Sequence, residues 1–470
     1  MKRLSSLLIL MAVLALVAAA CSSDSDDETT TTAAAETTTT AAATETTAAE
    51  TTTTAGAEAM EPYVFAASLP LTGNFAVPGQ LHNAGYQFCV DEINRLGGLN
   101  GHMVELIVSD DQSDPEQAVT QVQRHIDVDN ADVLLGTFSS LLTTPASTVA
   151  RDAGMVYPVP SGGALRIWSR GYENIFYFQQ NVAELIGFSP LSMIDYYAEQ
   201  GIIDPVPTTV AIVAADDPFA GAIVTGLTGG DVVDPGSGEV LTEVEGFLNN
   251  PATNPHGIEA VYVEKWPEEG FSDWNTLAQS MKDSGAEMVF AGTASPDDAV
   301  ALVNAMATVD YQPKLVYMSQ GAQIQFEETL GGNEQHITVH ASWHPLANFE
   351  STLAGQPYTN QDFIDGFTAS TGGPPDEDVA IPFAVCQGMA QAVLGTGGVD
   401  NAAMQTWLHD RTEADPVTTV LGPFYWDERG LPIDRSHIMV QWQDSELFFV
   451  YPVGLFPGTV DLVFEKDPFE

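Results

Sequence analysis

Three aspartates have the residue types and the spacing that could bind a calcium ion. Asp110, Asp111 and Asp114 follow an apolar run, and carboxylate oxygens are ligands that calcium prefers. A second interpretation explains Asp114 more simply, because Asp114-Pro115-Glu116-Gln117 has the pattern of a helix start with an aspartate cap. We favour the helix start, and solvation in a loop accounts for Asp110 and Asp111.

The sequence has no motif that is typical of a common catalytic or metal site. It contains no Walker loop, no His-Glu-x-x-His, no Cys-x-x-Cys and no Gly-x-Ser-x-Gly. The histidines lack the spacing of metal ligands, and His336 and His340 are expected at the surface of a strand. We therefore predict no catalytic residues, no metal and no cofactor.

Cys21 is positioned for covalent modification. Lys2 and Arg3 precede an apolar run that ends at Ala20, directly before Cys21. The run is shorter than the roughly 20 residues of a membrane span, so it predicts a signal peptide over residues 1–20. The alanines before Cys21 resemble a bacterial lipoprotein signal, which implies a lipid on Cys21; ordinary cleavage with an incidental cysteine is the alternative. No other stretch is long and apolar enough to cross a bilayer, so we expect this lipid to be the only membrane attachment.

Residues 21–61 have the composition of a tether rather than of a folded domain. After Cys21 they are almost entirely Thr, Ala, Glu, Ser and Asp, without aromatic residues. Such a segment cannot bury enough apolar surface to offset its ordering entropy, so we predict disorder up to about Pro62.

The charge of the chain excludes one class of partner. Its 470 residues include 64 acidic and 14 basic side chains, which gives a formal net charge of −50. Binding to nucleic acid needs clustered Lys and Arg, so no nucleic-acid partner is expected. The excess of acidic residues has two open explanations: adaptation to high salt, or a compositional bias of the lineage toward acidic residues without selective meaning.

The elements that must position a site alternate along the chain. Short apolar runs predict one set of strands and, further on, a second set, with helices between them such as Trp274–Ser284 and Pro296–Thr308. The expected strands are Tyr63–Leu69, Met103–Val108, Ala131–Leu135, Met155–Val159, Thr209–Ala214, Ala260–Val263, Glu287–Ala291 and Lys314–Met318. Two alternating runs predict an α/β protein with two doubly wound parallel-sheet lobes, whose ligand binds at the carboxyl ends of strands.

Five segments carry a resemblance to known proteins: Pro70–Gly79, Asp91–Ala118, Val133–Ser147, Gly422–Gly430 and Ile438–Pro452. In this order they resemble the branched-chain amino-acid-binding family, the type I periplasmic solute receptors of ABC uptake systems. The resemblance implies two lobes joined by a hinge that the chain crosses three times. It places the first lobe at 62–181 plus 345–421 and the second at 182–344 plus 422–470.

The resemblance also implies which residues contact the ligand. Ser140 matches the family serine that holds a carboxylate, and Ser161 lies where the family offers a carbonyl to an ammonium group. Gly163 replaces a carboxylate-binding threonine. Phe219 and Ala294 replace two tyrosines of the second lobe and make that wall apolar.

Gln320 falls at the family's acidic position, which neutralises the ammonium group of the ligand. Burying an ammonium group without a carboxylate partner costs several kcal/mol or more. We therefore expect a ligand without an ammonium group to bind better than leucine, unless Asp216 or Asp217 takes the place of the missing acid.

Cys89 and Cys386 fall in the same lobe by the family's topology. An exported pair of this kind can form a disulfide that closes a loop of roughly 300 residues. Two separately buried thiols are the alternative and our preference at this stage.

The main functional hypothesis is a lipid-anchored receptor that delivers a small polar organic solute to ABC permease subunits at the outer face of the cytoplasmic membrane. The solute is an amino acid, amide, urea or carboxylate. The second hypothesis is a sensor of the same fold without transport, and an enzyme is the third.

Overall fold

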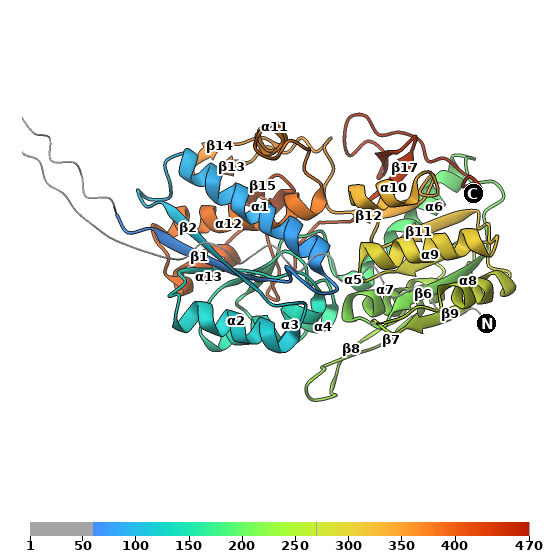
Figure 1. Cartoon of the computed structure of the whole chain (residues 1–470), viewed down its shortest axis with the longest axis horizontal. Helices are drawn as coiled ribbons and strands as arrows, with labels where there is room; N and C mark the ends of the chain where they lie inside the picture. The colour runs from blue at the N-terminus through green and yellow to red at the C-terminus, as the bar shows by residue number, and fades with distance from the viewer. Residues whose placement is uncertain (1–59, 269, 470) are drawn as a thin grey trace, which may run out of the picture. The chain divides into compact units, whose positions relative to one another are not determined.

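The computed structural model describes residues 60–268 and 270–469, all within one compact unit (Figure 1). The signal peptide expected at 1–20, Cys21 and nearly all of the tether lie outside the described residues. The description begins just before β1 (Tyr63–Leu69).

The first lobe is built on short parallel strands. β1 lies between β2 and β3, and β4 pairs with β5. After β1, the strands of this lobe are β2 (Val104–Asp110), β3 (Val133–Leu135), β4 (Tyr157–Val159), β5 (Ile175–Tyr177), β13 (Thr352–Leu353), β14 (Gln356–Pro357), β15 (Val417–Thr419) and β16 (Gly422–Phe424).

Helices come from two distant parts of the sequence to cover these strands. They are α1 (Ala76–Arg95), α2 (Pro115–Asp127), α3 (Ser140–Asp152), α4 (Leu165–Trp168), α11 (Asn360–Thr371), α12 (Glu377–Thr396) and α13 (Asn401–His409). The helix start predicted at Asp114 is confirmed, because its Oδ1 accepts hydrogen bonds from the backbone N–H groups of Glu116 and Gln117, both at 2.8 Å.

α12 runs through the core and corrects one expectation. Among the described residues it is the one helix long and apolar enough to cross a membrane, although no such stretch was expected after the signal. Because 78% of its apolar window is buried inside the fold, we interpret α12 as a core helix. Cys386 of α12 is joined to Cys89 of α1 by a disulfide with an S–S distance of 2.10 Å. The structure thus has the bridge rather than two separate thiols.

The second lobe is built on a seven-stranded sheet in the order β18-β17-β12-β11-β10-β6-β9. The five strands from β12 to β9 are parallel, and β17 and β18 are antiparallel to their neighbours. The strands are β6 (Thr209–Ala215), β9 (Glu259–Trp266), β10 (Met288–Gly292), β11 (Leu315–Met318), β12 (Thr338–Ala341), β17 (Ile438–Gln443) and β18 (Glu446–Tyr451).

The helices and the hairpin of the second lobe complete the fold. The helices are α5 (Ala183–Ile186), α6 (Phe188–Glu199), α7 (Pro218–Thr228), the short 3₁₀ helix η1 (Phe247–Asn249), α8 (Trp274–Asp283), α9 (Pro296–Thr308) and α10 (Ile324–Leu330). β7 (Gly230–Val233) and β8 (Val240–Val244) form an antiparallel hairpin that extends away from the sheet (Figure 1).

The chain crosses between the lobes three times, and the crossing segments contact one another. The Gln180 side chain donates to the Ser342 carbonyl at 2.5 Å, and the Asn181 side chain donates to the Arg435 carbonyl at 3.3 Å. The third crossing therefore lies near Arg435.

This position corrects the boundary expected at Gly422. β16 pairs with β15, and the Trp426 Nε1–H donates to the Tyr177 carbonyl at 2.8 Å. The backbone N–H of Tyr177 in turn donates to the Gly430 carbonyl at 2.9 Å. Residues 422–432 thus pack on the first lobe, because β16 returns as the second strand of a hairpin instead of leaving for the other sheet.

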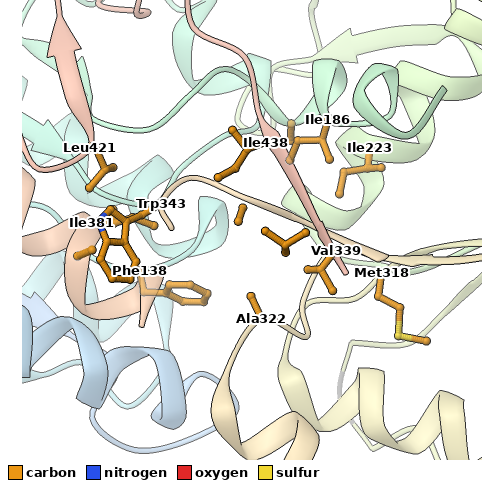
Figure 2. Packing of buried hydrophobic residues seen from close by; sticks show 14 of the residues in the cluster. Phe138, Ile186, Ile223, Met318, Ala322, Val339, Trp343, Ile381, Leu421 and Ile438 are labelled. Carbon is orange, nitrogen blue, oxygen red and sulfur yellow. The ribbon is translucent and has the colours of Figure 1, made fainter. Parts of the chain in front are cut away.

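Buried apolar side chains of both lobes belong to one contiguous cluster. Figure 2 shows part of it, including Phe138 and Ile381 of the first lobe and Met318 and Val339 of the second.

Candidate ligand-binding site

A cavity is lined by residues of both lobes and of the hinge. The first lobe supplies Phe75, Phe138, Ser139, Ser140, Ser161, Gly162, Tyr177, Gln179, Glu377, Asp378 and Ile381. The second lobe and the hinge supply Asp217, Phe219, Ala294, Ser319, Gln320, His340 and Ser342.

Most of these residues follow parallel strands directly. Ser139 and Ser140 follow β3, Ser161 follows β4 and Asp217 follows β6. The carboxyl ends of parallel strands in doubly wound sheets are where ligands bind, because the connecting loops diverge there and leave a crevice. The cavity thus lies where the strand order predicts a site.

Ser139 and Ser140 form the start of α3. Ser139 caps the helix with its Oγ, which accepts from the Leu142 N–H at 3.3 Å, and its backbone has a positive φ of 75°. Ser140 is the first helical residue, and its Oγ accepts from the Ala164 N–H at 3.1 Å. A helix N-terminus carries partial positive charge, so this end of the cavity is suited to an anionic group such as a carboxylate.

Ser161 lines the cavity, whereas Gly163 does not. The Ser161 Oγ lies 3.1 Å from Nε2 of His82 and accepts from Gln179 Nε2 at 3.2 Å. Gly162 lines the cavity in place of Gly163. A Cβ on Gly163 would lie 3.0 Å from the Tyr177 hydroxyl, so the tyrosine fills the space that a threonine would need.

The second lobe brings Phe219, Ala294 and Gln320 to the cavity. Gln320 is held in place, because its backbone N–H donates to Thr293 Oγ1 and its Oε1 accepts from Gln323 Nε2, both at 3.1 Å. Five of the six residues that the resemblance implied thus line one cavity, with Gly163 as the exception.

Three carboxylates also line the cavity, although the family's matched positions predicted none of them and only Asp217 was held as an alternative. Asp217 caps α7, and its Oδ1 accepts from the N–H groups of Phe219 at 2.7 Å and Ala220 at 3.0 Å. Glu377 accepts from the Ser342 N–H at 2.8 Å. Asp378 accepts from Gln323 Nε2 at 2.8 Å.

Burial raises the pKa of each of these carboxyl groups, that of Asp378 to about 6. For Glu377, the neighbouring charge of Asp378 raises the pKa further. No Lys or Arg lines the cavity, and no ion pair joins Asp217, Glu377 or Asp378 to a basic residue in the described part of the chain.

These acids change the expectation drawn from Gln320. A neutral residue at the family's acidic position suggested a neutral pocket, but Asp217, Glu377 and Asp378 supply negative charge from other positions. The sequence feature that could have indicated acids in the cavity is the run Asp376-Glu377-Asp378 before a long apolar helix.

His340 was expected at the surface and is instead buried, with 7% of its area exposed. It lies on β12, whose neighbours β11 and β17 cover both edges. Its Nδ1 lies 2.9 Å from the Tyr317 hydroxyl, and burial lowers its pKa to about 3, so the imidazole is neutral at pH 7. It offers the cavity a hydrogen-bonding group without positive charge.

Comparison with known proteins shows what this chain resembles. A family profile described as periplasmic binding protein matches residues 62–230. An amino acid binding protein of Pseudomonas aeruginosa is 25% identical over 398 residues, which cover 84% of this chain and 94% of that protein. The chain is similar to periplasmic binding proteins. A Leu/Ile/Val-binding protein homolog of Brucella abortus is also 25% identical, over 83% of this chain and 92% of that protein.

Solved structures show the fold of this chain. The branched-chain amino acid transporter substrate binding protein of Streptococcus pneumoniae, in complex with isoleucine, has a TM-score of 0.66 and 15% identity over 82% of this chain and 97% of its own. An ABC transporter solute binding protein of R. palustris, in complex with benzoate, has a TM-score of 0.66 and 18% identity over 87% and 98%. The fold is the two-lobed type I fold of periplasmic binding proteins.

Proposed function

We propose that this chain is a periplasmic binding protein and the lipid-anchored receptor of an ABC uptake system. It closes its two lobes on a small polar organic solute and delivers the solute to the permease subunits. The observation that carries the proposal is the cavity that both lobes line, mostly with residues that follow their parallel strands.

Closure follows from a ligand that contacts both lobes at once. A ligand shifts an equilibrium toward the state that it binds more tightly, and only the closed state lets one solute touch Ser140 and Asp217 together. A direct contact between the lobes also exists, because Gln323 of the second lobe donates to Asp378 of the first. This contact favours the closed state, and the bound solute supplies the rest of the free energy that favours the closed over the open state.

The composition of the cavity favours a solute with both polar and apolar parts. The α3 N-terminus provides a site for a carboxylate, while Phe75, Phe138 and Phe219 provide apolar surface. The proteins of similar fold described above hold isoleucine and benzoate, which are small solutes with polar and apolar parts.

Titration calorimetry of the unit from residue 58 onward tests solute binding. The panel contains amino acids, amines, amides, ureas and carboxylates, and we expect saturable binding of at least one member with one site per chain. Substituting Ser140→Ala should weaken that binding. Failure of the whole panel to bind would contradict the proposal.

Transport and anchoring need experiments in cells. Deleting the gene should abolish uptake of the radiolabelled solute, whereas a sensor would leave uptake intact and change gene expression instead. Cys21→Ala should release the protein from washed membranes, and retention of this variant in the membrane fraction would contradict the lipid anchor.

A further inference from the structure

One carboxylate oxygen in the cavity lacks a partner. Asp217 is 4% exposed; its Oδ1 accepts two backbone hydrogen bonds, and its Oδ2 has no hydrogen-bond partner among the described residues. A buried acceptor of this kind loses its hydration without compensation, which is costly for a charged group. Because Asp217 lines the cavity, a donor on the bound solute is the natural partner.

The role of Asp217 as a helix cap does not explain this oxygen. Capping requires one acceptor, and Oδ1 alone serves the N–H groups of Phe219 and Ala220. Asparagine and serine cap helices about as well as aspartate does. A charged side chain with an unused oxygen therefore points to a second task, which is to bind a ligand.

Two more carboxylates face the same cavity from the opposite lobe. Glu377 and Asp378 begin α12, whose cap is a third acid, Asp376. The groups that hydrogen bond to Glu377 and Asp378, the Ser342 N–H and the Gln323 amide, are both uncharged. The α12 N-terminus offsets part of this negative charge, and the charge of Arg166 acts on Asp217 from outside the cavity, but no Lys or Arg lines the cavity itself.

We propose that the solute carries a net positive charge, with an ammonium or guanidinium group that donates to Asp217 and faces Glu377 and Asp378. The inference rests on the proposed solute-binding function and narrows it to organic cations. The aromatic rings of Phe138 and Phe219, which also line the cavity, suit a cation as well, since the faces of aromatic rings attract positive charge.

Four linear molecules of similar length separate the charge requirement from shape. Lysine, norleucine, 1,5-diaminopentane and hexanoate share a five- or six-carbon chain and carry net charges of +1, 0, +2 and −1 at neutral pH. Calorimetry with the unit from residue 58 onward should show that lysine or 1,5-diaminopentane binds at least tenfold more tightly than norleucine, with hexanoate weakest. The two cations also show whether a carboxylate is needed beside the amine.

Variants locate the interaction. Asp217→Asn keeps an Oδ1 acceptor for the cap and removes the charge, so it should weaken binding of the cation about 10- to 100-fold while the melting temperature of the free protein is retained. Glu377→Gln should weaken cation binding as well. Asp114→Asn is the matched control, because Asp114 caps α2 through its Oδ1 as Asp217 caps α7 and does not line the cavity, and it should leave affinity unchanged.

The outcomes are distinguishable from failure of the proposed function. Equal or tighter binding of norleucine or hexanoate than of both cations overturns the cation inference but leaves solute binding intact. The cation inference also fails, again without loss of solute binding, if a neutral or anionic panel member binds while all cations fail. An unchanged affinity in Asp217→Asn overturns the role of this residue. If nothing in the whole panel binds, both proposals fail.

Discussion

The disulfide between Cys89 and Cys386 offers a sharp test of the fold, because it joins the two sequence halves of the first lobe. Cys89 lies on α1 and Cys386 on α12, and both are fully buried. The double variant Cys89→Ala/Cys386→Ala removes the bridge without leaving a single reactive thiol.

The size of the effect follows from the loop that the bridge closes. The two cysteines are 297 residues apart in sequence. The chain-entropy relation gives about 6 kcal/mol for a loop of this length at 25 °C, and native disulfides usually contribute roughly 2–5 kcal/mol because unfolded chains retain structure. We therefore expect the double variant to lose between about 2 and 6 kcal/mol of unfolding free energy.

Urea unfolding of the oxidised wild type, the reduced wild type and the double variant measures this loss. The reduced wild type keeps both sulfur atoms in the core, so its difference from the oxidised protein isolates the bridge from the packing of the side chains. Both bridge-free forms should unfold at clearly lower urea. Equal midpoints for all three forms, or two reactive thiols on denaturing the untreated soluble unit, would refute the assignment.

Three further predictions concern stability. Burial raises the pKa of Asp111 to about 6 from 3.8, so as pH rises the unfolded state loses this proton before the folded state does. The stabilising contribution of the protonated carboxyl group, present below about pH 4, is lost by about pH 6. Asp111→Asn should therefore gain about 3 kcal/mol of unfolding free energy relative to wild type between pH 4 and pH 7, as measured by urea melts. A flat difference between the two would contradict this. Gly226→Ala should destabilise the protein by about 1–3 kcal/mol, although alanine favours helices, because the added Cβ would lie 1.8 Å from the Glu184 carbonyl oxygen. A raised melting temperature of this variant would be inconsistent with this packing. With a net charge of −50, the melting temperature should rise as NaCl increases to about 1 M, where the Debye length is about 3 Å; a falling profile would remove like-charge repulsion as a factor.

Local sequence signals predicted much of the fold. The helix expected at Pro296–Thr308 is α9 with those same bounds, since Ser295 caps it and proline suits its first position. The succession of strands and helices along the chain followed from the alternation of apolar runs and helical patterns. These features depend on neighbours in the sequence, which is why they could be predicted.

Features that depend on distant residues could not be predicted. The third crossing was placed at Gly422, because nothing in the sequence shows that β16 pairs with β15. His340 looked like a surface residue because strand periodicity does not reveal that β17 pairs with β12.

The acidic lining of the cavity is the most consequential case. Asp217 and Glu377 lie 160 residues apart in sequence and belong to different lobes, so only the folded chain brings them to one cavity. At the family's acidic position this chain has the neutral side chain of Gln320. The residue at that one position does not reveal that other elements supply negative charge to the cavity.

A crystal structure of the unit from residue 58 onward with its bound solute tests the central claim most directly. We predict electron density for one small molecule in the cavity, in contact with Ser140 of the first lobe and with Asp217 Oδ2 of the second. A solute that touches one lobe only, or one that occupies the larger cavity lined by Trp343, Phe349 and Phe456 instead, would contradict the account.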